Sequence, residues 1–294
     1  GTDPGGTGFN RAVSAARSPG STFKIFTYAA ALEAGETPAT VRVSEPVSFE
    51  DPHQERPYEP REYSGNFFGS QRIRQAIATS SNVVAVKTHM ENGPEKTREM
   101  AERLGITSDL QTVPSLPLGP SAVSPLEMAR AYAPFATLGV NVEPQFITKI
   151  ADSNGRVLYE SEPVRTEVLD PRISFLMTDM MKTVLQSGTG SSLGPIVNRP
   201  AAGKTGTSQG NRDAYMVGYT PDLVAAVWVG NDENLSMPNQ TGARLAGPAW
   251  ANFMREALVG VSPRDFARPQ GLVAVQICPD TGLLHNPRCS LTPI

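Results

Sequence analysis

The sequence lacks an apolar run of eighteen residues, so nothing in it predicts a helix that crosses a membrane. The sequence also has little excess of charge of either sign. The formal net charge is -3 over 294 residues and only 19% of them are charged, which argues against a nucleic-acid-binding surface and against a long disordered acidic tail. A hydrophobic content of 39% instead indicates a globular chain, long enough to bury a full core in one large domain or two smaller ones.

Metal-ligating residues are few and badly spaced. His285 is the one histidine near the cysteine pair, whereas a structural zinc site takes four ligands. His53 and His89 have no ligand-spaced partners and are predicted to be surface or packing residues. Cys278 and Cys289 enclose turn-forming residues. A local disulfide is expected there if the protein works outside the cytoplasm, and two thiols in a reducing compartment.

The chain begins at Gly1-Thr2-Asp3 without an initiator methionine or a charged leader. This start favours an excised domain over a mature form. The glycine-rich stretch 1–8 is predicted to be a linker or the end of a strand.

Ser21 and Lys24 form a candidate catalytic dyad. Ser21 lies at the start of a predicted helix that runs to Leu32 and ends at Gly35. The helix has no polar side and should be buried, so Lys24 should be desolvated, which lowers the pKa of an amine. Lys24 lies one turn after Ser21 and could take its proton. A Ser-x-x-Lys match is, however, expected about once by chance in a chain of this length.

Two further polar groups interrupt apolar segments. Ser80-Ser81-Asn82 stands between a helix over 72–79 and the apolar run from Val83, where local patterns favour an ordinary helix cap. Lys204-Thr205-Gly206-Thr207 lacks the upstream glycine and the following helix of a phosphate-binding loop. A strand with a lysine, two hydroxyls and a glycine that lets a ligand's backbone approach suits an extended peptide with a terminal carboxylate.

The remaining pattern predicts an α+β fold, an antiparallel sheet flanked by helices with an inserted, mostly helical subdomain. Residues 36–69 are predicted to be a surface excursion whose aromatics, Tyr58, Tyr63, Phe67 and Phe68, could instead line a groove for an extended ligand. Further helices are expected over 94–104, 124–138, 170–188 and 248–258, and strands over 46–49, 145–151, 156–161, 214–219, 223–230 and 272–277.

Three motifs occur in one order: Ser21-x-x-Lys24, Ser80-x-Asn82 and Lys204-Thr205-Gly206. Together they resemble those of the penicilloyl-serine transferases, which comprise penicillin-binding proteins and serine β-lactamases. Flanking residues narrow the resemblance to the transpeptidase domain of class A, bifunctional penicillin-binding proteins, over nearly the whole chain; they are the stretches 9–12, 17–21, 123–129 and 212–221. One departure is Ile25, where a proline often follows the motif lysine.

The resemblance implies a domain organisation. A transpeptidase domain is expected over 1–262, with an α/β part at about 1–35 and 172–262 and the helical insertion at about 36–171. Residues 263–294 are expected to be a C-terminal extension with a strand and a possible disulfide loop. A glycosyltransferase domain and a membrane anchor, absent from this sequence, are expected in the full-length protein.

The resemblance also assigns roles to the motif residues. Ser21 is expected to attack the D-Ala-D-Ala carbonyl of a peptidoglycan stem peptide, with Lys24 activating it, Ser80 relaying a proton and Lys204 polarising that network. Which group is the base is disputed in the family. Substrate binding falls to Asn82 for the substrate amide, to the hydroxyls of Thr205 and Thr207 for a carboxylate, and to Gly206 and Ser208 beside them. The backbone N–H groups of Ser21 and Thr207 are expected to form the oxyanion hole.

The implied function is a D,D-transpeptidase acylated and inhibited by β-lactams, acting outside the cytoplasm, with no metal or cofactor and no nucleic-acid partner. A serine β-lactamase uses the same motifs plus a base for water, yet no convincing Glu-x-x-x-Asn stretch lies between Asn82 and Lys204. The same motifs are also compatible with a D,D-carboxypeptidase and, in a different class of protein, with a receptor domain that senses β-lactams.

Overall fold

A three-stranded antiparallel sheet lies at the centre of the fold. The computed structural model describes residues 8–287 and 289, so the predicted linker over 1–8 falls almost wholly outside the described residues. The strands are ordered β7-β8-β9, and they are β7 (Ala202–Thr207), β8 (Asp213–Tyr219) and β9 (Val224–Gly230). The predicted meander of 214–219 and 223–230, with the Lys204 motif on a neighbouring strand, is confirmed.

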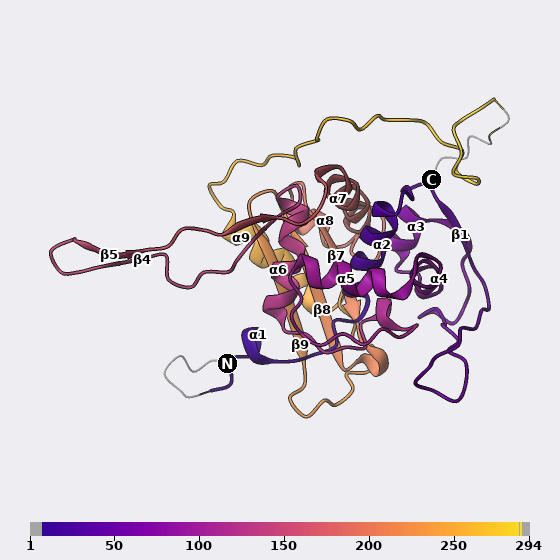
Figure 1. Ribbon diagram of the computed structural model, residues 1–294, viewed down its shortest axis with the longest axis horizontal. Helices are drawn as coiled ribbons and strands as arrows, with labels where there is room; N and C mark the ends of the chain where they lie inside the picture. The colour runs from indigo at the N-terminus through magenta and orange to yellow at the C-terminus, as the bar shows by residue number, and fades with distance from the viewer. Residues whose placement is uncertain (1–7, 288, 290–294) are drawn as a thin grey trace.

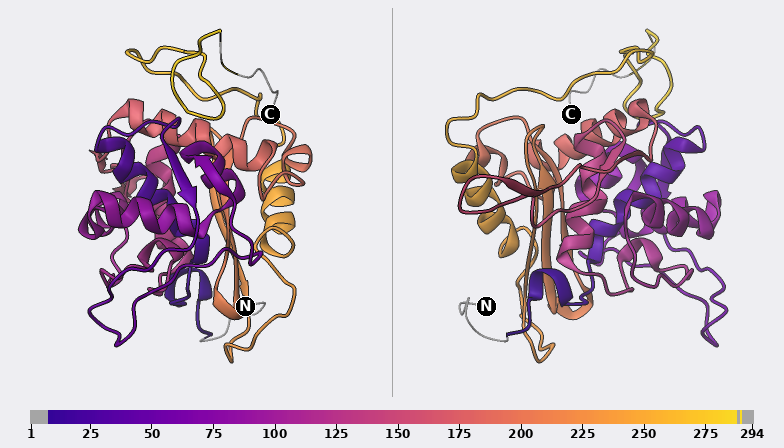
Figure 2. Two further views of the ribbon diagram at one scale, coloured as in Figure 1. Left: turned by 90° about the vertical axis from the view of Figure 1, so that its right-hand side faces the viewer. Right: turned by 60° about the vertical axis from the view of Figure 1, so that its left-hand side comes forward.

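Helices cover both faces of this sheet, giving three layers (Figure 2). One face packs against α9 (Ala246–Ala257), which itself contacts α8 (Gly194–Val197). The other face packs against α6 (Pro125–Ala136) and α7 (Pro171–Gln186). This is the α+β arrangement that the sequence predicts. The domain boundaries remain predictions, and one continuous core joins side chains from both predicted parts, among them Phe23, Met128 and Met180.

The predicted core helix is α2 (Lys24–Glu33), preceded by the 3-10 turn η1 (Gly20–Phe23). Every residue from Lys24 to Leu32 is buried, as a helix without a polar side requires. Gly35 ends it with a φ of 98°, and the N–H of Glu36 donates to the carbonyl of Ala31. The prediction is confirmed, except that Ser21 lies on the 3-10 turn and not on the α-helix.

The helices α3 (Ile73–Thr79), α4 (Asn82–Asn92), α5 (Pro94–Leu104) and α7 pack against α2 (Figure 1). The predicted helices over 72–79, 94–104, 124–138 and 170–188 begin within one residue of their predicted starts. Ser124 caps α6 through a reciprocal pair of hydrogen bonds with Glu127, the arrangement that the Ser-Pro-x-Glu pattern indicates. The remaining helical elements are α1 (Arg11–Ser14), η2 (Leu116–Leu118) and η3 (Gln209–Asn211).

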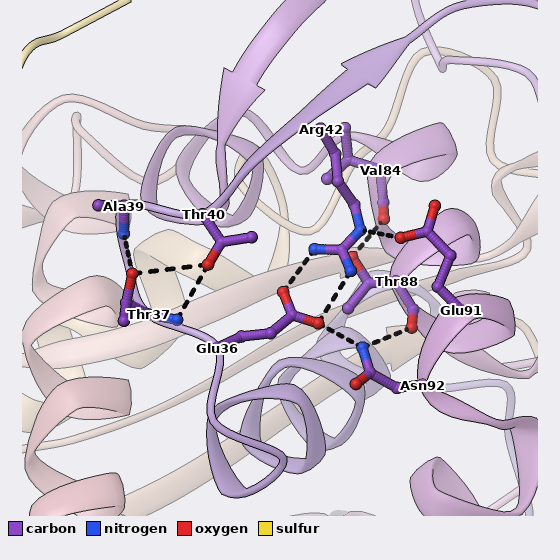
Figure 3. A network of polar contacts seen from close by, with 9 residues as sticks. All are labelled: Glu36, Thr37, Ala39, Thr40, Arg42, Val84, Thr88, Glu91 and Asn92. Atoms are coloured by element: carbon purple, nitrogen blue, oxygen red, sulfur yellow. Dashed lines mark hydrogen bonds and ion pairs between the residues drawn. The ribbon is translucent and has the colours of Figure 1, made fainter. Parts of the chain in front are cut away.

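A polar network fixes α4 relative to the end of α2 (Figure 3). Arg42, on β1 (Val41–Ser44), donates hydrogen bonds to the carboxylates of Glu36, after α2, and of Glu91, on α4. Asn92 donates to the same Glu36 carboxylate. Because the Arg42 side chain is only 9% exposed, this ion pair is screened less by water than a surface pair. These hydrogen bonds fix the position of α4 relative to the end of α2.

Three two-stranded sheets lie outside the central one. They are β1 with β2 (Gly69–Arg72), β3 (Val140–Val142) with β6 (Arg165–Glu167), and β4 (Lys149–Ala151) with β5 (Val157–Glu160). The last is the predicted hairpin, which projects away from the body (Figure 1). The predicted strand over 46–49 is wrong, since one bridge between Phe49 and Tyr58 is assigned there.

The C-terminal extension crosses the outside of the domain as an arc without regular structure until Ile277 (Figure 1). The predicted strand over 272–277 is therefore wrong. Val273 and Val275 are 82% and 57% exposed, so neither a neighbouring strand nor the core stabilises a strand there. Of the two alternatives left open for the cysteines, the structure has the disulfide, between Cys278 and Cys289, with their Cα atoms 5.5 Å apart. No helix within 8–287 is both long and apolar enough to cross a bilayer.

Candidate active site

Ser21 lies at the floor of a cleft of about 850 Å³. The turn that carries it rests directly on strand β7. Gly20 has a φ of 55°, and a Cβ on it would lie 2.6 Å from the carbonyl oxygen of Thr207 and 3.0 Å from its nitrogen. A Cβ on Gly206 would lie 2.4 Å from the carbonyl oxygen of Pro19. Two facing glycines therefore bring the backbone of the turn against the strand.

On its Cβ side Gly206 meets Pro19 and Thr22, so this glycine admits the Ser21 turn. Its part in substrate binding stays a prediction.

Lys24 lies beneath the cleft and has no exposed surface. Its Nζ donates to the carbonyl oxygen of Ser80 at 2.6 Å, to the Oδ1 of Asn82 at 2.6 Å and to the hydroxyl of Ser80 at 3.2 Å. Its described hydrogen bonds thus go to the second motif and not to Ser21. Burial and the nearby charge of Lys204 hold the pKa of Lys24 well below its usual range, which confirms the direction predicted from the sequence.

Ser80 lies between the two buried lysines. Its hydroxyl accepts a hydrogen bond from Lys204 Nζ at 2.8 Å and from Lys24 Nζ at 3.2 Å. Its backbone is left-handed, with φ 60° and ψ 38°, at the end of α3. The neighbouring Ser81 caps α4 by accepting from the N–H of Val84. The predicted helix cap in this motif is therefore confirmed, and its residue is Ser81 rather than Ser80.

Lys204 is equally buried, on β7. Besides Ser80 it donates to the carbonyl oxygen of Thr205 at 3.0 Å, and burial lowers its pKa to about 7. Both amines can therefore lose a proton far more readily than a lysine in water.

Hydroxyl groups cover the walls of the cleft, including those of Thr205, Thr207 and Ser208. The N–H of Gly242 donates to the Thr207 hydroxyl at 3.1 Å, and the Ser208 hydroxyl donates to the carboxylate of Asp213 at 2.9 Å. Tyr58, Tyr63 and Phe68 line the same cleft, which confirms a groove-lining position for these three aromatics, whereas Phe67 lines a separate, smaller pocket.

Comparison with known proteins tests which protein family has this arrangement of side chains. The family described as "Penicillin binding protein transpeptidase domain" matches residues 3–255. The chain belongs to this transpeptidase family.

Its relatives agree with the class A resemblance. Penicillin-binding protein 2D of Bacillus subtilis (strain 168) is 37% identical over 290 residues, covering 96% of this chain and 42% of the relative. The structure of Penicillin-Binding Protein 1A from Haemophilus influenzae matches with a TM-score of 0.90 and 30% identity, over 94% of this chain and 47% of that one. A structure of PonA1 from Mycobacterium tuberculosis in complex with penicillin V matches with a TM-score of 0.79 and 28% identity, over 90% and 75%. The chain thus spans less than half of the curated relative.

The transpeptidase motifs meet as expected. Around the cleft the structure brings together Ser21, Lys24, Ser80, Asn82, Lys204 and the hydroxyls of the third motif. In the described part of the chain no group of three or more His, Cys, Asp or Glu residues could hold a metal ion.

Two polar features of the transpeptidase cleft are missing from the sequence prediction. Thr189, placed in a loop after the long helix, has its hydroxyl 2.7 Å from that of Thr205 and lines the cleft. Glu62, in the excursion, is buried against the second motif. The Gly-Thr-Gly run at 188–190 could have indicated the first. No local pattern indicates the second.

Lys204 should make the stability of the transpeptidase domain depend on pH. Since its pKa falls from 10.5 to about 7 on folding, the unfolded chain binds the extra proton between these values, and stability rises with pH across that window. Between about pH 7 and pH 10, the free energy of unfolding of the wild type should rise with pH more than that of Lys204→Met does. We expect the difference to be on the order of 3 kcal/mol. Urea titrations of both proteins measure this, and parallel profiles would contradict it.

Proposed function

We propose that this domain is a D,D-transpeptidase that cross-links peptidoglycan stem peptides through an acyl-enzyme on Ser21, and that β-lactams acylate and inhibit it. The observation that carries the proposal is the Ser80 hydroxyl, which is held between two buried lysines and belongs to a residue that lines the same cleft as Ser21. The penicillin V complex of the similar PonA1 protein supports the choice of β-lactams.

Lys24 in its neutral form suits the role of base. A neutral amine has two N–H donors and one lone pair. The two shortest contacts, to the Ser80 carbonyl and to Asn82 Oδ1, take both donors. In this form the contact of 3.2 Å with the Ser80 hydroxyl is no longer a donation from Lys24, and the lone pair is left to receive a proton. Burial lowers the pKa of Lys24 and so favours this neutral form.

In the proposed reaction, the Ser21 oxygen attacks the D-Ala-D-Ala carbonyl while its proton passes to Lys24. The C–N bond then breaks, and the proton passes through the Ser80 hydroxyl to the departing D-alanine amine, leaving an ester on Ser21. A stem-peptide amine attacks this ester, the cross-linking amide bond forms as the ester C–O bond breaks, and the proton that the amine loses restores the Ser21 hydroxyl.

The remaining groups bind and polarise the substrate. The amides of Ser21 and Thr207 would donate to the oxyanion, which the close approach of the Gly20 turn to Thr207 supports. Asn82 would hold the substrate amide, while the hydroxyls of Thr205, Thr207 and Ser208 would bind its carboxylate. Lys204 would hold the Ser80 hydroxyl in place.

We also propose that the full-length protein acts on the outer side of the cytoplasmic membrane and carries an anchor and a glycosyltransferase domain. The disulfide and the relatives' greater length support this placement.

Intact-mass measurements during incubation with penicillin test the function. We expect a penicilloyl adduct that persists in the wild type and is absent from Ser21→Ala. Rapid turnover of the drug would favour a β-lactamase, and no adduct would contradict the proposal. Adding a donor peptide and an acceptor amine then separates the possible activities: a cross-linked product supports the transpeptidase, hydrolysis alone a carboxypeptidase, and neither product a sensor.

A further inference from the structure

Glu62 is a buried carboxylate with four hydrogen-bond donors around it. It is 5% exposed and lies in the excursion that precedes β2. Its oxygens accept from the hydroxyls of Ser44 at 2.7 Å and Ser81 at 2.6 Å. They also accept from the backbone N–H groups of Asn82 at 2.7 Å and Val83 at 3.3 Å. These four hydrogen bonds satisfy the buried carboxylate and fix its position relative to the donors.

Three of these contacts, from Ser81, Asn82 and Val83, lie at the start of α4, where the backbone N–H groups have no partners within the helix. A negative charge there is also favoured by the helix dipole. Glu62 therefore supports the N-terminus of α4 from outside, together with the Ser81 cap.

Arg61 and Glu62 hold Asn82 from two directions. The Glu62 carboxylate accepts from the Asn82 backbone, and the Arg61 carbonyl accepts from the Asn82 side-chain Nδ2 at 2.8 Å. With Nδ2 turned to Arg61, the side-chain oxygen of Asn82 is directed to Lys24 Nζ, 2.6 Å away. The orientation of Asn82 toward Lys24 thus depends on two adjacent residues outside the three motifs.

Glu62 also acts on Lys24 through its charge. The charged groups that act on Lys24 are Lys204, from β7, and Glu62, from the excursion; the motif groups bonded to Lys24, Ser80 and Asn82, are uncharged. Burial and Lys204 lower the pKa of Lys24, whereas Glu62 raises it. The carboxylate therefore offsets part of the cost of an ammonium group at this depth.

We propose that Glu62 is a positioning residue for acyl transfer, which fixes Asn82 and the start of α4 and thereby sets the orientation and the charge state of Lys24. This inference rests on the proposed role of Lys24 as base, and it gives the excursion a part in the reaction beyond lining the cleft.

The test compares three variants by their rate of acylation with penicillin as a function of pH. Glu62→Gln removes the charge and presents an amide to the N–H donors. We expect its acylation rate to fall about tenfold or more, because Asn82, which accepts a hydrogen bond from Lys24, is displaced. We also expect the acid limb of its profile to move toward lower pH by about one unit, since Lys24 loses an attractive charge.

Glu62→Asp and Asp51→Asn serve as comparisons. Glu62→Asp keeps the charge but shortens the side chain, so its rate should fall while the acid limb stays in place. Asp51 is the other buried carboxylate of the excursion, 5% exposed, and accepts from the backbone N–H of His53 and the side chain of Gln54, neither of which belongs to a motif. Asp51→Asn should cost stability and leave both the rate and the acid limb near wild type.

The outcomes separate this inference from the proposed function. If the wild type forms no adduct, the function itself fails. If the wild type is acylated but Glu62→Gln and Glu62→Asp match Asp51→Asn in rate and in acid limb, Glu62 is merely structural and the inference is overturned. If Glu62→Gln does not fold, Glu62→Asp decides by itself, and an acylation rate equal to that of the wild type contradicts the positioning role.

Discussion

Replacing Lys24 by methionine is expected to lower the rate of Ser21 acylation by penicillin about 10³-fold, within the range that general-base catalysis contributes. Methionine fills much of the same buried volume and cannot take a proton. The acid limb of the wild-type pH profile should also disappear, because Lys24 is the group whose neutral form is needed. Stopped-flow acylation rates across a pH series measure both effects.

The control for this substitution is Lys87→Met. Lys87 lies on α4 and pairs with Glu45, away from the cleft, so its loss should change the acylation rate less than about twofold. A Lys24→Met protein that is folded and acylated at the wild-type rate would show that another group takes the Ser21 proton.

Replacing Gly20 by alanine is the second large effect. The added Cβ would meet the backbone of Thr207 at 2.6 Å, and the residue would also keep a left-handed φ of 55°. We expect a loss of about 3 kcal/mol in unfolding free energy, from backbone strain and overpacking together. Because the turn and β7 are forced apart, acylation should also fall by about 10² or more, as when one oxyanion donor is lost. Chemical denaturation and acylation kinetics report the two effects.

Two other glycines separate the causes. Gly35 has a φ of 98° and no atom within 4 Å of its Cβ position, so Gly35→Ala should show the cost of backbone strain alone, with normal acylation. Gly206 has the steric contact without a left-handed φ, so Gly206→Ala should slow acylation. Equal kinetics in all three variants would contradict the proposed oxyanion hole.

The fold could be predicted from the sequence wherever a local pattern coincides with burial. The largely apolar run after Lys24 forms the buried helix α2, and the Ser124-Pro125 start forms a capped helix. The prediction failed where an extended pattern had no partner strand, as over 272–277, because strand formation depends on pairing and burial.

The candidate site divides in the same way. The motif residues could be predicted because each carries a distinct chemistry at a fixed spacing. Their partners could not, since Glu62 and Asn82 are twenty positions apart and meet only through tertiary structure. The hydrogen bonds of Lys24 show the same limit: neighbourhood on a helix predicts Ser21 beside it, whereas the described hydrogen bonds of the amine go to Ser80 and Asn82.

The left-handed backbone of Ser80 has a consequence for laboratory evolution. A non-glycine residue at φ 60° costs about 1 kcal/mol or more, which glycine would relieve, but glycine would also remove the hydroxyl between the two lysines. A screen that rewards heat resistance alone should therefore enrich glycine at position 80 and return inactive proteins. Any selection for a more heat-stable form of this domain therefore has to test catalytic activity from its first round.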